Sequence, residues 1–190
     1  MTALDRRQVI AELLRERGDL LVVSGLGGTS WDVAAGGDDP RNFYLWGGMG
    51  GAVPLALGLA LAQPARRVLA VTGDGEMLMG LGSLATVGAQ APRNLAIVVI
   101  DNERYGETGG QATHTAAGCD LVAIARGAGL RSAALVTQFE QLAALRAQVH
   151  AGRDTSFAVC KVTTAVSPMI VPPRDGALLR TRFRQALGLG

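Results

Sequence analysis

Asp74 and Asn102 each follow a short apolar run that is rich in β-branched residues. Such runs, at 68–72 and 95–100, are bounded by glycine, proline and asparagine and are typical of strands buried on both faces of a parallel sheet. The segment 77–90 between them is rich in Met, Leu and Ala and predicts one helix, which gives a β-α-β unit. Because parallel strands end at the same edge of a sheet, we expect Asp74 and Asn102 side by side in the crevice where open α/β sheets bind ligands.

The types of these two residues suggest a metal and an anion. Carboxylate and amide oxygens suit Mg²⁺, which usually takes one or two protein groups together with phosphate oxygens. Gly73 and Gly75 would allow a tight backbone turn beneath a bulky anion, and the N–H groups from Gly75 onward would lie at the positive end of a helix. The predicted ligand is a magnesium diphosphate, although a Gly-Asp-Gly sequence by itself is also a common turn.

The spacing of the two motifs is more specific than either motif. Gly73-Asp74-Gly75 is followed by Asp101-Asn102 after the 25 intervening residues 76–100, a pattern that resembles the thiamine diphosphate signature. Residues 20–165 resemble the diphosphate-binding, C-terminal type domain of thiamine diphosphate-dependent 2-oxo acid decarboxylases. The segments 73–88 and 108–111 look most like the beta subunits of the sulfopyruvate and phosphonopyruvate decarboxylase group.

This resemblance implies a set of site residues. The metal ligands would be Asp74, Asn102 and the main-chain carbonyl of Arg104. Met49 would be the side chain wedged beneath the cofactor, with its N–H on the aminopyrimidine N3′, and the Gly47 carbonyl would accept from the 4′-amino group. The cofactor-binding residues implied are Gly28, Thr29, Ser30, Gly47, Met49, Gly73, Asp74, Gly75, Glu76 and Asn102. Alternatives remain open, since 28–30 could be a plain Gly/Ser turn and Met49 a core methionine.

Two residues depart from the family pattern. Asp101 stands where the family often has Asn, and it could orient Asn102 or fill a polar pocket. Glu76 places a carboxylate in the first turn of a helix, which is favourable for the helix dipole but repels a diphosphate unless the side chain points aside.

The segment 103–115 is polar, rich in glycine and without periodicity, so it predicts a long loop of the kind that often acts as a lid. Tyr105, Gln111 and His114 are candidates to face the substrate. Tyr105 and His114 are the predicted catalytic residues, His114 because imidazole titrates near neutrality. His150 is expected to be a solvated cap.

Composition narrows the class of protein. The 190 residues are 48% hydrophobic, and the formal charge of +2 is too small to indicate nucleic-acid binding. No apolar run approaches the roughly 20 residues of a membrane span, and the opening segment lacks a signal-peptide pattern, so we expect a cytoplasmic protein. Cys119 and Cys160 are isolated, which argues against zinc or iron–sulfur sites.

The order of the remaining segments predicts a doubly wound α/β fold with a mainly parallel sheet of about five or six strands. Further strands are expected at 20–23, 43–46, 132–136 and 157–162, and helices at 4–14 (ended by Gly18), 53–62, 121–128 (capped by Asp120) and 139–149, with a glycine-rich loop at 24–30. We expect residues 1–165 to form the thiamine diphosphate-binding domain and 166–190 a C-terminal extension packed on it or on a partner. Arg180, Arg182 and Arg184 on its terminal helix would form a solvated basic face.

The resemblance also implies what the chain lacks. In the family, a glutamate that activates the cofactor comes from a separate pyrimidine-binding domain, and no glutamate here has that domain's sequence context. The six glutamates of this chain are Glu12, Glu16, Glu76, Glu103, Glu107 and Glu140. We therefore expect a beta-type subunit that binds thiamine diphosphate and Mg²⁺, completed by an alpha-type subunit in an alpha2beta2 heterotetramer that decarboxylates a 2-oxo acid. The alternatives are a carboligase subunit, similar to acetolactate synthase or benzaldehyde lyase, and a non-catalytic α/β ligand-binding module.

Overall fold

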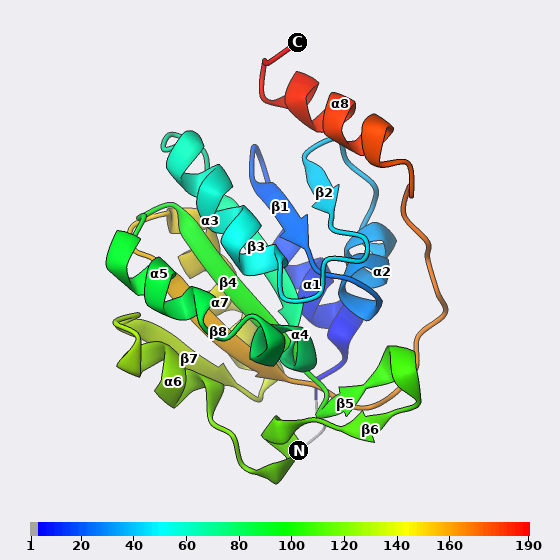
Figure 1. Cartoon of the computed structure of the whole chain (residues 1–190), viewed down its shortest axis with the longest axis vertical. Helices are drawn as coiled ribbons and strands as arrows, with labels where there is room; N and C mark the ends of the chain where they lie inside the picture. Colours follow the sequence, from blue (N-terminus) through cyan, green and yellow to red (C-terminus); the bar gives the residue numbers. More distant parts are fainter. Residues whose placement is uncertain (1–3) are drawn as a thin grey trace.

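The computed structural model describes residues 4–190, which are built around a six-stranded parallel sheet with the strand order β2-β1-β3-β4-β8-β7 (Figure 1). These strands are β1 (Leu21–Ser24), β2 (Asn42–Tyr44), β3 (Val68–Gly73), β4 (Leu95–Asp101), β7 (Ser132–Val136) and β8 (Ser156–Lys161). A small antiparallel hairpin consists of β5 (Arg104–Tyr105) and β6 (Gln111–Ala112).

Helices cover both faces of the sheet, as Figure 1 shows. The helices are α1 (Arg6–Leu14), α2 (Gly28–Ala35), α3 (Ala52–Ala62), α4 (Asp74–Met79), α5 (Ser83–Gln90), α6 (Leu121–Gly127), α7 (Leu142–Ala151) and α8 (Gly176–Ala186), with short 3-10 helices η1 (Gly106–Thr108), η2 (His114–Ala117) and η3 (Phe139–Gln141). Residues of α1, α2 and α7 belong to one core cluster, and residues of α3, α4, α5 and α6 to the other. The predicted doubly wound α/β class and strand number are confirmed.

Strand β4 shows why the sequence pattern produces this arrangement. All of its residues are buried, and successive side chains of a strand point to opposite faces. One core cluster contains Ala96, Val98 and Ile100, and the other contains Leu95, Ile97 and Val99. The six consecutive apolar residues 95–100 can therefore be buried only in the middle of a sheet that is covered on both faces.

The single helix predicted for 77–90 is wrong, because α4 ends at Met79 and α5 begins at Ser83. Gly80 lies between them, and a Cβ atom added to it would be 3.1 Å from the Gly50 Cα atom. The segment around Gly50 thus packs directly on this break. Backbone contact at a glycine ends α4 and holds the segment that carries Met49 beside it.

The glycine-rich loop predicted for 24–30 is shorter than expected. Gly27, with a φ of 65°, precedes α2, which begins at Gly28. Thr29 and Ser30 therefore lie in the first turn of a helix. Other boundaries also differ: the first helix ends at Leu14 without reaching Gly18, the strand expected at 43–46 is Asn42–Tyr44, and 139–149 begins as η3 before α7.

The C-terminal helix α8 packs beside β2, at the edge of the sheet (Figure 1). The ring of Phe183 meets that of Phe43 edge-on, with centroids 5.5 Å apart. Arg182 donates to both carboxylate oxygens of Asp38, at 2.6 and 2.8 Å, so the predicted solvated basic face is wrong for this residue. Arg180 and Arg184 are exposed. No helix within residues 4–190 has the length and apolar character that crossing a membrane requires.

Candidate active site

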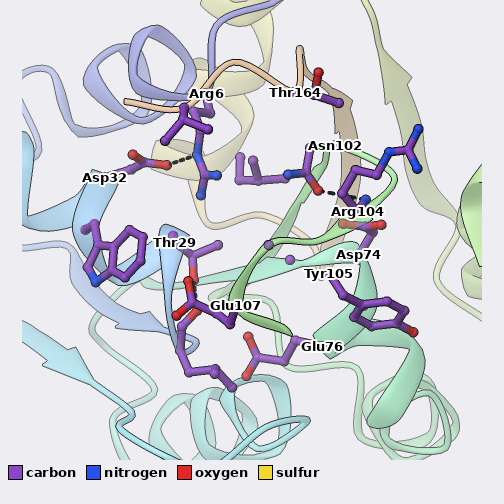
Figure 2. A pocket seen from close by; sticks show the side chains of 18 of the residues that line it. Arg6, Thr29, Asp32, Asp74, Glu76, Asn102, Arg104, Tyr105, Glu107 and Thr164 are labelled. Atoms are coloured by element: carbon purple, nitrogen blue, oxygen red, sulfur yellow. Dashed lines mark hydrogen bonds and ion pairs between the residues drawn. The ribbon is translucent and has the colours of Figure 1, made fainter. Parts of the chain in front are cut away.

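A cavity of about 670 Å³ lies at the carboxyl edge of the sheet (Figure 2). Gly73 of β3 pairs with Ile100 of β4, so Asp74 and Asn102 follow neighbouring strands, and both line this cavity. The other predicted cofactor, metal or catalytic residues on its wall are Gly28, Thr29, Met49, Gly73, Gly75, Glu76, Arg104 and Tyr105. The carboxyl ends of β1, β2, β3 and β4 lie at one edge of the sheet and thus bring together residues from four separate sequence segments.

Asp74 is the most firmly held polar group of the site. It is 2% exposed, and its Oδ2 accepts hydrogen bonds from the hydroxyls of Thr113 (2.5 Å) and Thr115 (3.2 Å). Burial raises the pKa of Asp74; the Thr113 hydrogen bond opposes this shift and the nearby charge of Asp101 adds to it. Both side-chain hydrogen bonds go to one oxygen, so no described side chain donates to Oδ1.

Asp101 supports this arrangement from behind. The Thr115 hydroxyl that contacts Asp74 also donates to Asp101 Oδ1 at 2.9 Å, and Lys161 Nζ donates to Asp101 Oδ2 at 3.0 Å. Lys161 is the last residue of β8 and pairs with Asp101, the last residue of β4. The lysine charge offsets the repulsion between the two buried carboxylates.

The chain after β4 turns sharply at Asn102. The Asp101 carboxylate accepts from the N–H of Glu103, and the Asn102 amide oxygen accepts from the N–H of Arg104, both at 3.1 Å. Glu103 has a φ of 61°, a left-handed conformation that is unfavourable for a residue with a side chain. Asp101 therefore fixes the turn that contains Asn102 and Arg104. This agrees with the first of its two predicted roles, which was to orient Asn102.

The carboxylate of Glu76 is turned toward the first glycine-rich segment. Its Oε2 accepts from the Thr72 hydroxyl at 2.9 Å, and a Cβ atom added to Gly25 would be 2.7 Å from its Oε1. Glu76 is 5% exposed, and burial raises its pKa, opposed first by the Thr72 hydrogen bond. The side chain therefore braces the ends of β1 and β3, which reduces the charge conflict expected at this position.

Four predicted residues do not line the cavity: Ser30, Gly47, Gln111 and His114. Ser30 is buried, and its hydroxyl is 2.8 Å from that of Ser24 and donates to the Gly25 carbonyl at 2.5 Å. His114 is exposed on η2. Met49, in contrast, is on the wall and 39% exposed, which differs from a core methionine.

The segment predicted as a long loop at 103–115 is more ordered than expected. It forms the β5–β6 hairpin with η1 between the strands. The Tyr105 ring lies on Gly75, because a Cβ atom there would be 2.7 Å from its Cδ1, and the Glu107 carboxylate lies 2.9 Å from the corresponding position of Gly27. Residues of β5 and η1 therefore form part of the cavity wall.

The donor set suits a magnesium diphosphate better than a metal held by protein alone. No group of three or more His, Cys, Asp or Glu side chains in residues 4–190 could hold a metal ion. Asp74 and Asn102 supply only part of an octahedral shell, so phosphate oxygens would have to complete it. Gly73 leaves space for such a group on the cavity wall, because no atom lies within 4 Å of a Cβ atom added there.

Sequence reasoning missed several residues of the site: Arg6, Asp32, Thr113, Thr115 and Lys161. The alternation Thr113-His114-Thr115 was an available signal, because two hydroxyls two residues apart can point to one side. Arg6 and Asp32 gave no such signal, since they come from separate helices that only the fold brings together.

Comparisons with known proteins agree with this geometry. Residues 32–162 match the family described as "Thiamine pyrophosphate enzyme, C-terminal TPP binding domain". The chain is 42% identical over 126 residues to the sulfopyruvate decarboxylase subunit beta of Methanocaldococcus jannaschii (66% of each chain), and 41% identical over 150 residues to that of Methanothermobacter thermautotrophicus (78% of this chain, 80% of the relative). It is 44% identical over 142 residues to the phosphonopyruvate decarboxylase of Streptomyces viridochromogenes, covering 75% of this chain but 34% of that protein.

Solved structures give the same result. A putative thiamin diphosphate-dependent enzyme from Mycobacterium smegmatis superposes with a TM-score of 0.71 and 26% identity, over 85% of this chain and 32% of the other. Benzoylformate decarboxylase from Polynucleobacter necessarius shares the fold, with a TM-score of 0.70 over 87% of this chain and 34% of the other. The resemblance stated from the motifs is confirmed. The chain belongs to the C-terminal TPP-binding domain family of thiamine pyrophosphate enzymes.

Proposed function

We propose that this chain is the beta-type subunit of a heteromeric thiamine diphosphate-dependent decarboxylase that acts on a 2-oxo acid. The single observation that carries the proposal is the shared cavity wall of Asp74, Asn102, Thr29 and Met49, which follow the carboxyl ends of β3, β4, β1 and β2. The beta-subunit names of its relatives support the same assignment.

In this proposal, Asp74, Asn102 and the Arg104 carbonyl bind Mg²⁺, and the diphosphate lies across Gly28, Thr29 and Gly75. The hydroxyls of Thr113 and Thr115 hold the Asp74 carboxylate in one orientation and favour its charged form, which a metal ligand requires. The turn at Glu103 fixes Asn102 and Arg104 relative to it.

The remaining wall residues position the reacting end. Met49 would lie beneath the cofactor rings, and the Gly47 carbonyl and Met49 N–H would hold the pyrimidine. Bound thiamine diphosphate supplies the electron sink that loss of carbon dioxide from a 2-oxo acid needs. Tyr105 lies on the cavity wall over Gly75, and we assign to it the exchange of a proton with bound substrate. His114 is exposed, and a catalytic role would require it to face a site completed by the partner.

A partner subunit completes the proposed enzyme. Glu76 and Glu107 are the glutamates on the cavity wall. The Glu76 carboxylate accepts from the Thr72 hydroxyl and packs on Gly25, and Glu107, in η1 of the hairpin, packs on Gly27. We therefore assign the activating glutamate to an alpha-type subunit, in an alpha2beta2 assembly in the cytoplasm.

The test is cofactor binding and turnover with the protein encoded by the neighbouring gene. We expect magnesium-dependent binding of thiamine diphosphate, and release of carbon dioxide from at least one of sulfopyruvate, phosphonopyruvate and benzoylformate, only when both chains are present. Condensation with an added aldehyde in place of carbon dioxide release would indicate a carboligase. No cofactor in either preparation would contradict the proposal and leave a non-catalytic ligand-binding module.

A further inference from the structure

We infer that Arg6 is an additional anion-binding residue of this site: its guanidinium, held by Asp32, binds the terminal phosphate of the diphosphate. Arg6 lies outside the segment 32–162 that matches the cofactor-binding family. The inference rests on the proposed function, which it extends by one residue from α1.

The backbone fixes the start of α1 at the carboxyl edge of the sheet. Leu4 forms a parallel bridge with Val162, just beyond the end of β8, and the N–H of Thr163 donates to the Leu4 carbonyl at 2.9 Å. Asp5 then caps the helix by accepting from two backbone N–H groups. Arg6 therefore enters the cavity from a short, anchored segment.

The Arg6 guanidinium is oriented by Asp32 and has N–H groups that are available to a ligand. Its Nε donates to Asp32, which is 3% exposed, and no described residue accepts a hydrogen bond from its Nη1 or Nη2. A Cβ atom added to Gly28 would be 2.7 Å from the Arg6 Cζ, so the guanidinium lies directly on the first residue of α2. Figure 2 shows it beside Asp32 and directed toward Thr29.

The charges around Arg6 leave it free to neutralise an anion. Asp32 is shared with Arg7, whose Nε is 3.4 Å from it, so two guanidinium groups face one carboxylate. Arg7 also donates to the Pro168 carbonyl, whereas Arg6 has no second acceptor among the described residues. The positive charge of Mg²⁺ is partly neutralised by Asp74, so part of the negative charge of a diphosphate stays without a counter-charge. A planar guanidinium can donate paired hydrogen bonds to phosphate oxygens.

The position of Arg6 selects the terminal phosphate. The guanidinium lies over Gly28 and Thr29, whereas Met49, the proposed support of the cofactor rings, belongs to a different segment of the wall. Arg104 also lines the cavity, but its exposed side chain extends away from Thr29 in Figure 2. Of the two guanidinium groups that contact Asp32, Arg6 is the one that lies over Gly28.

The test compares thiamine diphosphate with thiamine monophosphate. Each is titrated calorimetrically, with saturating Mg²⁺ and constant ionic strength, into the full chain, with its partner subunit present where binding requires it. We expect Arg6→Gln to weaken binding of thiamine diphosphate by roughly 10- to 100-fold, the loss of charge-assisted hydrogen bonds, without weakening the monophosphate. Arg15→Gln, at an exposed arginine that ends the same helix and does not line the cavity, is the control and should keep both affinities.

The outcomes separate this inference from the proposed function. Unchanged diphosphate affinity in Arg6→Gln, or an equal loss for both ligands, would overturn the role of Arg6 while leaving the proposed function standing. No diphosphate binding by the unaltered protein would overturn both. If Arg6→Gln fails to fold, Arg6→Lys replaces it, because lysine keeps the positive charge beside Asp32. A smaller loss of affinity, confined to thiamine diphosphate, is then expected. Unchanged diphosphate affinity in Arg6→Lys would overturn the inference.

Discussion

At the scale of residues, the site depends on how two buried carboxylates are held close together. Asp74 and Asp101 share the hydroxyl of Thr115, and Lys161 neutralises Asp101 from the far side. Partners behind a metal ligand orient it and set its basicity. Asp101 therefore acts through Asp74 and through the turn at Asn102, which explains how an aspartate can stand where the family often has asparagine.

Replacing either proposed metal ligand tests the site directly. Asp74→Ala and Asn102→Ala should each weaken the magnesium-dependent affinity for thiamine diphosphate, because each removes a metal ligand. The loss of affinity should exceed the roughly 10- to 100-fold that is typical when a residue behind a metal ligand is replaced. Calorimetric titration measures the loss, and circular dichroism checks the fold. Asp154→Ala is a control at an exposed acidic residue. Retained cofactor in both site variants would rule out the proposed metal site.

The shared hydroxyl makes a second prediction. Thr115→Val keeps the shape of the side chain but removes its donor to both carboxylates, so Mg²⁺ affinity should fall about 10-fold. Titration of Mg²⁺ at saturating thiamine diphosphate measures this change. Thr137→Val, at an exposed threonine, should have no effect. Equal Mg²⁺ affinity in Thr115→Val would mean that Thr113 alone orients Asp74.

At the scale of elements, α8 protects one edge of the sheet. An uncovered edge strand leaves backbone groups unpaired, and β2 is the edge strand on that side. Leu179 and Phe183 are buried, and the Trp46 indole donates to the Pro173 carbonyl at 2.8 Å. The segment before α8 is therefore held along its course as well as at its end.

Loss of the main apolar contact should destabilise the fold. Phe183→Ala is expected to lower the free energy of unfolding by about 3 kcal/mol, because it removes a buried ring and leaves a cavity against Phe43. Denaturant titration measures this value. Arg184→Ala, on the exposed face of the same helix, should stay within about 0.5 kcal/mol. A similar small change in Phe183→Ala would show that α8 contributes little to stability.

The ion pair of α8 makes stability depend on pH. The Arg182 hydrogen bonds lower the pKa of Asp38 below its usual range. A carboxyl with a lowered pKa in the folded state stabilises the fold above its unfolded pKa, and this contribution disappears as the pH falls through the folded pKa. Asp38→Asn should therefore lower the melting temperature at pH 7, and the difference from the unaltered chain should shrink toward pH 3. A difference that is constant with pH would contradict the prediction.

At the scale of the whole molecule, exposed apolar side chains lie on the wall of the cavity. Met49 is 39% exposed at the cavity, and Val166, also on the wall, is 95% exposed. Met169, Ile170 and Val171 continue this exposed apolar segment along the chain. Exposed apolar side chains that gather beside a site are typical of a surface for another protein.

The proposed assembly predicts a defined mass. Mixing the chain with its alpha-type partner should give a complex of two copies of each chain, measured by light scattering with size-exclusion chromatography. Val166→Asp should weaken the complex, because a charge at the interface loses water without gaining a partner. Arg180→Ala, exposed on α8, is the control. Free chains at micromolar concentration would argue against the proposed heterotetramer.

The sequence by itself determined the fold class and the pairing of the two motifs. Buried strands of a parallel sheet are continuous apolar runs, and 68–71 and 95–100 show this pattern locally. The cap at Asp120 is likewise a local feature, and it is observed. Asp74 and Asn102 were predictable as neighbours because parallel strands end at one edge of the sheet.

The tertiary structure alone decided which other residues join them. Gly80 ends α4 because the backbone at Gly50 contacts it, and Thr115 reaches Asp74 because the β5–β6 hairpin folds back over the sheet. Arg6 and Asp32 meet only because α1 and α2 pack on the same face. These contacts join segments that are distant in the chain, so no local pattern encodes them, and only the packed sheet brings their side chains within hydrogen-bonding distance.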